Sequence, residues 1–519
     1  MAPTTVRTRF APSPTGFMHI GNLRSALYEY LVAKSQQGQF VLRLEDTDRE
    51  RYVAGAEQII YQTLATVGLK HDEGPDIGGP YAPYIQSERL NQYLKPAQEL
   101  IAKGSAYYVF NELAPQNADQ TELSDTADKV AKDKGAREFN EQPFQIARFA
   151  TDDAPGYLET ASGDFVALSE EEIAQLLQEG KKYIIRQRMP RTGETSFSDE
   201  VFGTITVENK ELEDQILLKS DGFPTYNFAN VIDDHAMEIT HVVRGSEYLS
   251  STPKYNLLYE ALGYPLPTYI HLPLILGTDG KKLSKRHGAT SFADLVAEGY
   301  LPEAITNYIA FLGWAPGDDT REIFSLAELE QVFSAKGIGK APAVFDYEKL
   351  RWYNEQYIRQ MDKASFIAYI EPTIKQLFAD QFVDLDILAE VLPSRLSKLS
   401  DLKEMLTFAT TRQALSTEIF THKKSKLTPA LSQRVLKEVV TYLENEPDLE
   451  REELHNFLMS LGEKLELKTG QIMGPVRIGL ARQQVTPGGA TELVLLLGQK
   501  EATARLREAL DFLNALPEA

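Results

Sequence analysis

The sequence predicts a parallel α/β domain that is interrupted by an α+β insertion and followed by an all-helical C-terminal region. Three observations support this fold class. Strand and helix patterns alternate over residues 5–67, strand patterns return between residues 181 and 275 after a polar stretch, and helical periodicity dominates from about residue 320.

The N-terminal elements follow one another as strand, turn, helix, strand and helix. Residues 5–11 alternate around Val6 and Phe10, and residues 12–16 form a turn that contains proline and glycine. A helix is expected from about Asn22, because apolar residues recur there at helical spacing. The remaining expected elements are a strand at 39–44, which leads into the acidic residues 45–48, and a helix at 56–67.

The middle of the chain carries the predicted insertion. The pattern loosens from about residue 94, and residues 112–142 are polar, acidic and nearly free of aromatic residues, which is typical of a solvated segment. A doubly wound domain interrupted at this point accounts for the later strand patterns. These patterns lie at 181–219, 226–232, 239–244 and 269–275.

Composition excludes several classes of site. The chain has 519 residues, enough for roughly three to five domains. It has no cysteine, which excludes disulfides, thiol nucleophiles and thiolate metal sites. No apolar signal segment and no long apolar run is present, so we expect a cytoplasmic protein.

The net charge of −21 argues against a nucleic-acid partner only if it is spread evenly. Residues 111–180 contain 16 acidic and 5 basic side chains, whereas residues 181–191 contain five basic side chains and no acidic one. Residues 395–440 contain nine basic and four acidic side chains. Basic stretches therefore remain available for a polyanion.

Two segments can bind phosphate, although the common glycine-rich phosphate motifs are missing. In residues 12–22 a strand leads through a turn into His19-Ile20-Gly21-Asn22 at a helix start, where free N–H groups favour phosphate. Residues 277–286 form a glycine-flanked loop with the sequence Lys-Leu-Ser-Lys-Arg at 282–286. Taken singly, the first segment is better explained as a turn that caps an ordinary helix, and the second as a solvated basic turn.

Together, the two segments resemble the paired signatures of class I aminoacyl-tRNA synthetases. Further segments are similar to the bacterial glutamyl-tRNA synthetases of that class. These segments lie at 9–16, 43–48, 86–89, 221–226, 230–235 and 350–352.

The resemblance implies a Rossmann-type catalytic domain at 1–93 and 225–273 and an inserted acceptor-binding domain at 94–224. It further implies a stem-contact region with the Lys-Leu-Ser-Lys-Arg loop at 274–362 and a helical anticodon-binding domain at 363–519. It also implies activation of glutamate by ATP with Mg²⁺ to glutamyl-adenylate and pyrophosphate. Glutamate then passes to the terminal adenosine of tRNA(Glu), and whether tRNA(Gln) is also charged stays open. No protein nucleophile is needed, and a monomer is expected.

The resemblance also assigns site residues. Substrate glutamate would contact Arg9, Ala11, Ser13, Glu45, Tyr226, Asn230 and Arg244, where arginines pair with carboxylates and Glu45 with the ammonium group. ATP would contact His19, Gly21, Asn22, Glu247, Lys282, Ser284 and Lys285, with Lys285 as the main phosphate contact and Arg286 peripheral. Arg395 and Lys398 lie near the expected anticodon region, although residues of this kind are more commonly solvated helix charges.

The sequence departs from many bacterial relatives at their zinc site. Those relatives carry Cys-x-Cys after an Ala-Tyr pair, where this chain has Val109-Phe110-Asn111, so we expect no zinc. We also expect the acidic segment 112–142 to point away from tRNA, while residues 181–191, 281–286 and 395–440 face the acceptor end, ATP and the anticodon arm.

Four other classes of protein share part of this pattern. A glutaminyl-tRNA synthetase shares the catalytic half but has β-barrels in its anticodon part, whereas residues 363–519 are expected to be helical. The short paralogue that glutamylates a tRNA base lacks an anticodon part, and a chain of 519 residues is too long for it. Small nucleotidylyltransferases are shorter and do not explain Arg9, Glu45 and Arg244 together. A non-catalytic RNA-binding relative is disfavoured by the intact signature lysines.

Overall fold

The computed structural model describes residues 5–47, 53–112, 154–317, 319–378, 383–423, 425–446 and 450–517. These residues form two compact units. Unit 1 contains Met1–Asp294 and Thr306–Asp346, and unit 2 contains Leu295–Ile305 and Tyr347–Ala519. The chain passes from unit 1 to unit 2 within α7 (Phe292–Ala297), returns within α8 (Pro302–Ala310), and enters unit 2 again between Asp346 and Tyr347.

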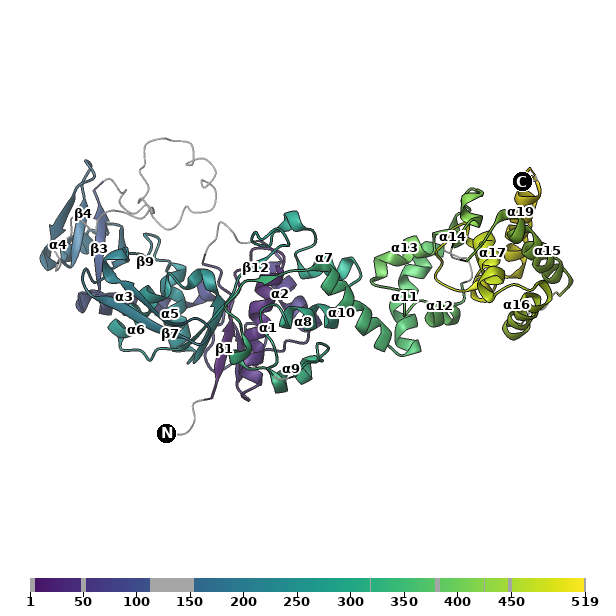
Figure 1. Cartoon of the computed structure of the whole chain (residues 1–519). Coiled ribbons are helices and arrows are strands. Elements are labelled where there is room, and N and C mark those ends of the chain that lie inside the picture. The colour runs from purple at the N-terminus through teal and green to yellow at the C-terminus, as the bar shows by residue number, and fades with distance from the viewer. Residues whose placement is uncertain are drawn as a thin grey trace. The chain divides into compact units, whose positions relative to one another are not determined.

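Parallel strands form the centre of unit 1 (Figure 1). β1 (Arg7–Phe10) pairs with β2 (Gln39–Leu42), and β10 (His241–Gly245) pairs with β11 (Thr268–Leu272). The backbone N–H of Thr240 donates to the carbonyl of Arg7 at 3.0 Å and links the start of β10 to β1. α1 (Ile20–Lys34) contacts β1, β2 and β10 and buries its apolar residues against them.

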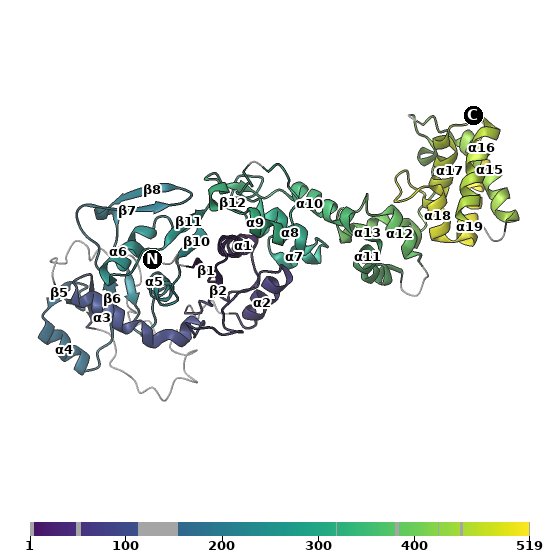
Figure 2. The same cartoon turned by 90° about the horizontal axis from the view of Figure 1, so that it is seen from below.

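The remaining strands of unit 1 extend this centre and build a separate sheet. β7 (Glu194–Asp199) and β8 (Gly203–Glu208) form an antiparallel hairpin that joins β11 (Figure 2). A five-stranded sheet has the order β5-β4-β3-β6-β9. Its strands are β3 (Ala106–Asn111), β4 (Gly156–Glu159), β5 (Phe165–Leu168), β6 (Tyr183–Gln187) and β9 (Ile216–Leu218).

The helices of unit 1 cover these strands, and a short strand pair follows the last parallel strand. α3 packs against β3, and α5 and α6 join the same apolar core. The helices are α2 (Ala56–Thr66), α3 (Leu94–Ala102), α4 (Glu170–Gln178), α5 (Tyr226–Ala236), α6 (Thr252–Leu262) and α9 (Leu326–Val332). The strand pair is β12 (Ile275–Leu276) with β13 (Ala343–Val344).

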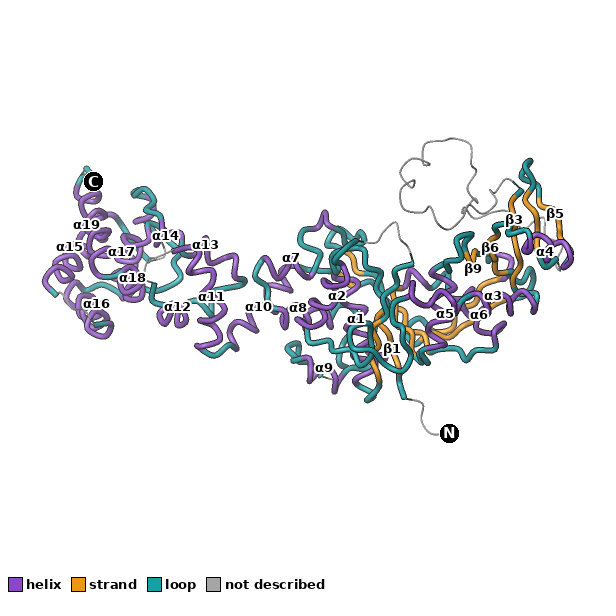
Figure 3. Tube along the Cα trace, turned by 180° about the vertical axis from the view of Figure 1, so that it is seen from behind, coloured by secondary structure: helices purple, strands orange, loops and turns teal. Residues whose placement is uncertain are grey.

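Unit 2 contains helices and, among its described residues, no strand (Figure 3). Leucine, valine and phenylalanine side chains from most of its helices fill one core, including Val435 and Val439. Its longer helices are α10 (Tyr347–Gln360), α11 (Lys363–Phe378), α12 (Leu385–Val391), α15 (Pro429–Asn445), α16 (Arg451–Leu465), α17 (Thr469–Ala481), α18 (Ala490–Leu497) and α19 (Gln499–Asn514). Two one-turn helices are α13 (Leu402–Met405) and α14 (Thr407–Thr410).

The fold class is confirmed, and one element of the prediction is wrong. Residues 226–232, predicted as a strand, belong to helix α5. Phe228, Ala229, Val231 and Ile232 are all buried, so the apolar run alone did not distinguish a strand from a buried helix. Of the acidic segment 112–142, only Glu112 belongs to the described residues. Asp48 also lies outside them.

Candidate active site

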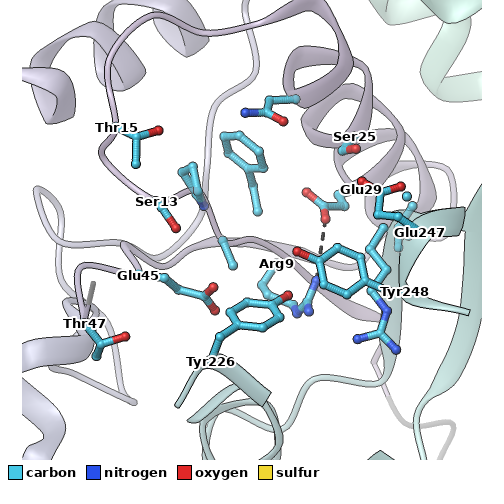
Figure 4. Close-up of a pocket in the computed structure, with 17 residues that line it drawn as sticks. Arg9, Ser13, Thr15, Ser25, Glu29, Glu45, Thr47, Tyr226, Glu247 and Tyr248 are labelled. Carbon is cyan, nitrogen blue, oxygen red and sulfur yellow. Dashed lines mark ion pairs between the residues drawn. The ribbon is translucent and has the colours of Figure 1, made fainter. Parts of the chain in front are cut away.

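A cavity of about 500 Å³ lies where β1 and β10 end (Figure 4). The carboxyl ends of parallel strands are the usual place for a ligand in such a sheet. Side chains from both strands, from the turn after β1, from α1 and from the start of α5 line it. The lining residues are Arg9, Phe10, Ala11, Pro12, Ser13, Thr15, Asn22, Ser25, Glu29, Glu45, Thr47, Tyr226, Val243, Arg244, Gly245, Glu247 and Tyr248.

The cavity brings together eight of the residues predicted from the sequence. They are Arg9, Ala11, Ser13, Asn22, Glu45, Tyr226, Arg244 and Glu247. Asn230 does not line the cavity; it is buried on α5, and its Nδ2 donates to the carbonyl of Tyr226 at 2.8 Å. It can therefore act on the cavity through the position of Tyr226.

The first signature starts helix α1. His19 is the N-cap residue, and its Nδ1 accepts a hydrogen bond from the backbone N–H of Gly21 at 3.1 Å. The N–H of Ile20 donates to the carbonyl of Thr290 at 3.0 Å, which ties the helix start to the segment after the basic loop. Burial lowers the pKa of His19, and the charge of Lys282 lowers it further. A neutral imidazole therefore stands close to the cation of the second signature.

The second signature lies on a turn between β12 and a short 3₁₀ segment, Lys285–His287. The N–H of Gly277 donates to the carbonyl of Lys281, and the N–H of Leu283 donates to the carbonyl of Ile275. Leu283 is buried and anchors the turn, whereas Lys281 and Lys282 are exposed. The backbone of Lys285 belongs to the 3₁₀ segment, while its side chain lies outside the described part of the structure.

A buried ion-pair network forms the floor of the cavity. Asp234 accepts hydrogen bonds from Arg9 Nε at 2.9 Å and from Arg43 Nη1 at 2.8 Å. Arg43 Nη2 also donates to Glu45 Oε1 at 3.0 Å. Although burial opposes ionisation, the two arginines hold the pKa of Asp234 below its usual value. Burial raises the pKa of Glu45 to about 7, with Arg43 and Arg9 opposing the shift.

Arg244 enters the cavity from the end of β10 and is held by a separate chain of hydrogen bonds. Its Nε donates to His271 Nε2 at 3.1 Å, and its Nη2 donates to Thr252 Oγ1 at 2.8 Å. His271 Nδ1 lies 2.7 Å from Asp199 Oδ2, so this nitrogen carries the proton and Nε2 accepts from Arg244. Burial lowers the pKa of His271; the hydrogen bond to Asp199 opposes this shift and the charge of Arg244 adds to it.

Aromatic rings complete the setting of Arg244. Its guanidinium carbon lies 4.6 Å from the ring centre of Tyr255 and 5.3 Å from that of Tyr248, both within the range of cation–π attraction. Tyr226 and Tyr248 pack with ring centres 5.5 Å apart. The cavity thus presents two fixed guanidiniums, Arg9 and Arg244, and a carboxylate, Glu45, within one enclosed space.

Comparisons with known proteins agree with this arrangement. Residues 5–352 match the family model for the catalytic domain of class I tRNA synthetases (E and Q), and residues 347–510 match an anticodon-binding domain. The chain belongs to the class I tRNA synthetases.

Relatives of this synthetase chain match it along nearly its whole length. A glutamate–tRNA ligase of Clostridium botulinum strain Hall is 47% identical over 511 residues, covering 98% of this chain and 99% of the relative. One from Clostridium acetobutylicum is 44% identical over 518 residues, covering 99% and 100%. The crystal structure of glutamate–tRNA synthetase from Elizabethkingia anophelis matches with a TM-score of 0.80 at 33% identity, covering 98% of this chain and 100% of that one.

A second cavity, of about 710 Å³, lies in unit 2 of this synthetase. Arg395 lines it, and Arg395 Nη1 donates to the carbonyl of Thr486. Lys398 does not line it; its Nζ lies 2.7 Å from Glu298 Oε2 in an ion pair. Of the two residues predicted near the anticodon region, Arg395 therefore borders this cavity and Lys398 does not.

The region where many bacterial synthetases bind zinc is held here by aromatic packing. Val109 and Asn111, at the expected cysteine positions, are buried in β3, as is Phe110 between them. Tyr183 packs against Tyr108 and Phe110 with ring centres 5.1 and 5.8 Å away, and Tyr107 packs on Tyr157 at 5.3 Å. Among the described residues, no group of three or more histidine, aspartate or glutamate side chains is placed to hold a metal ion.

Several cavity residues were not predicted from the sequence. Ser25 and Glu29 follow Asn22 by three and seven positions, so they lie on the same face of α1. That spacing could have identified them once Asn22 was assigned. Thr15, Thr47 and Tyr248 carry no such signal.

None of the helices in the described ranges has the length and apolar character needed to cross a bilayer.

Proposed function

We propose that this class I synthetase is a glutamate–tRNA ligase. It joins glutamate to ATP to form glutamyl-adenylate and pyrophosphate, and then transfers glutamate to the terminal adenosine of tRNA(Glu). The observation that carries the proposal is that Arg9, Arg244 and Glu45 all line the same cavity. Glutamate has two carboxylates and one ammonium group, and these three side chains offer the matching charges.

The residue roles follow from this match. Arg9 and Arg244 bind the two carboxylates, and Glu45 binds the ammonium group. Ser13, Tyr226 and the backbone at Ala11 supply hydrogen bonds that orient the substrate, and Asn230 supports Tyr226 through its carbonyl. Fixed charges of this kind act mainly by positioning the substrate carboxylate for attack on the α-phosphate.

ATP is assigned to the start of α1 and the basic loop. His19, Gly21 and Asn22 lie at the helix start, where backbone N–H groups favour phosphate. Lys282, Ser284 and Lys285 stabilise the charge that develops on the phosphates, and Glu247 contacts the adenosine. Mg²⁺ accompanies ATP and is held mainly by phosphate and water oxygens. No protein zinc site is expected.

The domain assignment is part of the proposal. Residues 1–93 and 225–273 form the catalytic domain, 94–224 the acceptor-binding insertion, 274–362 the stem-contact region and 363–519 the anticodon-binding domain. The helical character of unit 2 supports an anticodon region of the bacterial glutamyl type rather than the β-barrels of a glutaminyl enzyme. We expect a cytoplasmic monomer, and Arg395 is the residue expected to read the anticodon.

Glutamate-dependent exchange of pyrophosphate into ATP tests the proposal. The assay contains tRNA, because relatives typically need it for activation. Exchange with glutamate and none with glutamine or aspartate is expected, and no exchange with glutamate would contradict the proposal. Charging of purified tRNA(Glu) and tRNA(Gln) then determines whether the second tRNA is also a substrate.

A further inference from the structure

Glu29 is a buried carboxyl group in the wall of the cavity that none of the assigned roles uses. It lies on the cavity-facing side of α1 with 3% of its surface exposed. Its Oε1 is 3.6 Å from Arg9 Nη1, too far for a hydrogen bond. Its Oε2 is buried and has no hydrogen-bond partner among the described residues. Figure 4 shows Glu29 and Arg9 facing each other beside Tyr226.

The charges around Glu29 leave it without a full counter-charge. The charged groups that act on it are Arg9 from β1, Asp234 from α5, and Arg43 and Glu45 from the segment directly after β2. Asp234 accepts hydrogen bonds from both arginines, and Glu45 accepts from Arg43. Two guanidiniums therefore face three carboxyl groups, and Glu29 has the weakest contact.

Burial acts on Glu29 in the same direction as this imbalance. It raises the pKa of Glu29 well above its usual value, and the charge of Arg9 only partly offsets the effect. Asp234 and Glu45 raise the pKa of Glu29 further through repulsion.

The bound substrate sharpens the conflict, and this step rests on the proposed function. Glutamate brings a net charge of −1 and places one carboxylate on Arg9. Arg244, the further guanidinium that lines the cavity, takes the other substrate carboxylate. With it counted, Arg9, Arg43 and Arg244 balance Asp234, Glu45 and the substrate only if Glu29 is uncharged. An ionised Glu29 adds a negative charge next to the substrate carboxylate. Glu247, which also lines the cavity, has Arg24 as its own neighbouring cation.

We propose that Glu29 is a positioning residue that must be protonated for glutamate to bind, because its ionised form competes with the substrate carboxylate for Arg9. Protonated Glu29 leaves the Arg9 guanidinium free on the cavity side while Asp234 holds its Nε. Ionised Glu29 draws Arg9 towards α1 and repels the incoming carboxylate.

The proposal makes the pH dependence of glutamate binding two-sided. As the pH falls through about 7, Glu45 becomes protonated and loses its attraction for the ammonium group, so KM for glutamate rises. As the pH rises through the pKa of Glu29, the competing carboxylate forms and KM rises again. Only the second rise depends on Glu29.

The test compares the full-length wild-type chain with Glu29→Gln, Glu29→Ser and Glu73→Gln. Glutamine keeps the shape of a protonated carboxyl group, and serine supplies a second neutral variant should the first fold poorly. Glu73 is the matched control: it is also a buried glutamate beside an arginine, Arg7, but it does not line the cavity. KM and kcat for glutamate are measured in tRNA charging between about pH 6 and about pH 9.

The ratio of the wild-type KM to the KM of either Glu29 variant is expected to rise with pH, by up to about tenfold per pH unit above the pKa of Glu29. The kcat profiles stay parallel, and Glu73→Gln follows the wild type in KM. Loss of the substrate's own ammonium proton at high pH affects all variants equally and cancels in the ratio. A ratio that is constant with pH in proteins that charge glutamate would overturn the role of Glu29. Absence of glutamate charging in every protein would instead overturn the proposed function, and this inference with it.

Discussion

The cavity at the end of β1 and the basic loop at 277–287 both present cations, but they hold them in opposite ways. Arg9 and Arg244 are buried, with 3% and 6% of their surfaces exposed, and their side-chain hydrogen bonds and ion pairs are to other buried side chains. Lys281 and Lys282 are exposed on a turn anchored by Leu283. One region fixes its charges before a ligand arrives, and the other leaves them on the surface.

This difference matches what the two regions are proposed to do. An amino acid is recognised by its shape and the spacing of its charges, so rigid arginines separate glutamate from its neighbours. Phosphates carry their charge on several equivalent oxygens, and a lysine on a turn can follow them as the reaction proceeds. The comparison predicts that changes in the cavity act on glutamate binding, while changes in the loop act on the rate.

The largest effect is expected from Arg244→Ala. The variant removes a guanidinium that His271 and Thr252 hold in place and leaves the substrate carboxylate unpaired. We expect kcat/KM for glutamate to fall by about a thousandfold, since such buried charge pairs are worth several kcal/mol when one partner is lost. Steady-state charging measures it, and a fall of less than tenfold would break the distinction between the two regions.

Lys285→Ala should slow the reaction without weakening glutamate binding. Loss of one charge-stabilising group is expected to reduce the rate of ATP–pyrophosphate exchange by at least about a hundredfold while the chain remains folded. Lys281→Ala is the matched control, because Lys281 is an exposed lysine of the same loop outside the assigned ATP contacts. Equal losses in the two variants would show that the loop acts through its total charge rather than through Lys285.

Glu45→Gln probes the cavity through pH. In the wild type, the pKa of about 7 means that ionised Glu45 attracts the substrate ammonium above that pH and loses the attraction below it. The variant is expected to raise KM for glutamate by roughly thirtyfold at pH 8 and to abolish the rise in KM at low pH. An acid limb of unchanged size in the variant would assign that limb to another group.

The smallest effect is expected from His271→Gln. The variant keeps Arg244 itself but removes the imidazole that links it to Asp199. In the wild type, His271 Nε2 accepts a hydrogen bond from Arg244 Nε, and His271 Nδ1 is bonded to Asp199. We expect KM for glutamate to rise by about tenfold with little change in kcat, as small errors in the position of a binding group cost affinity. A change in kcat with constant KM would contradict a positioning role for His271.

The sequence predicted much of the fold and part of the cavity. The parallel strands and both signature segments were predicted because strand ends and helix starts leave clear local patterns, whereas the eight cavity residues were assigned through the resemblance to glutamyl-tRNA synthetases. Glu29 was missed because a single glutamate within a helix looks like a surface charge until the fold buries it. The roles of His271 and Asp199 were missed for a related reason, since 72 residues separate these partners and no spacing rule links them.

The aromatic packing around β3 could not be predicted from the sequence either. The loss of the cysteine positions was visible, but what replaces them depends on which strands become neighbours. Tyr183 reaches Tyr108 and Phe110 only because β6 pairs with β3 in antiparallel register. The strand prediction at 226–232 was wrong for a similar reason, since tertiary burial rather than local pattern determines the state of a short apolar run.

The most direct test of the account is a paired measurement of KM for glutamate and the maximal rate of ATP–pyrophosphate exchange, with tRNA present, in Arg244→Ala and Lys285→Ala. Arg244→Ala is expected to raise KM for glutamate far more than it lowers the maximal rate, whereas Lys285→Ala is expected to lower the maximal rate with little change in that KM. The same ratio of the two effects in both variants would contradict the division between a cavity that binds glutamate and a loop that stabilises phosphate charge.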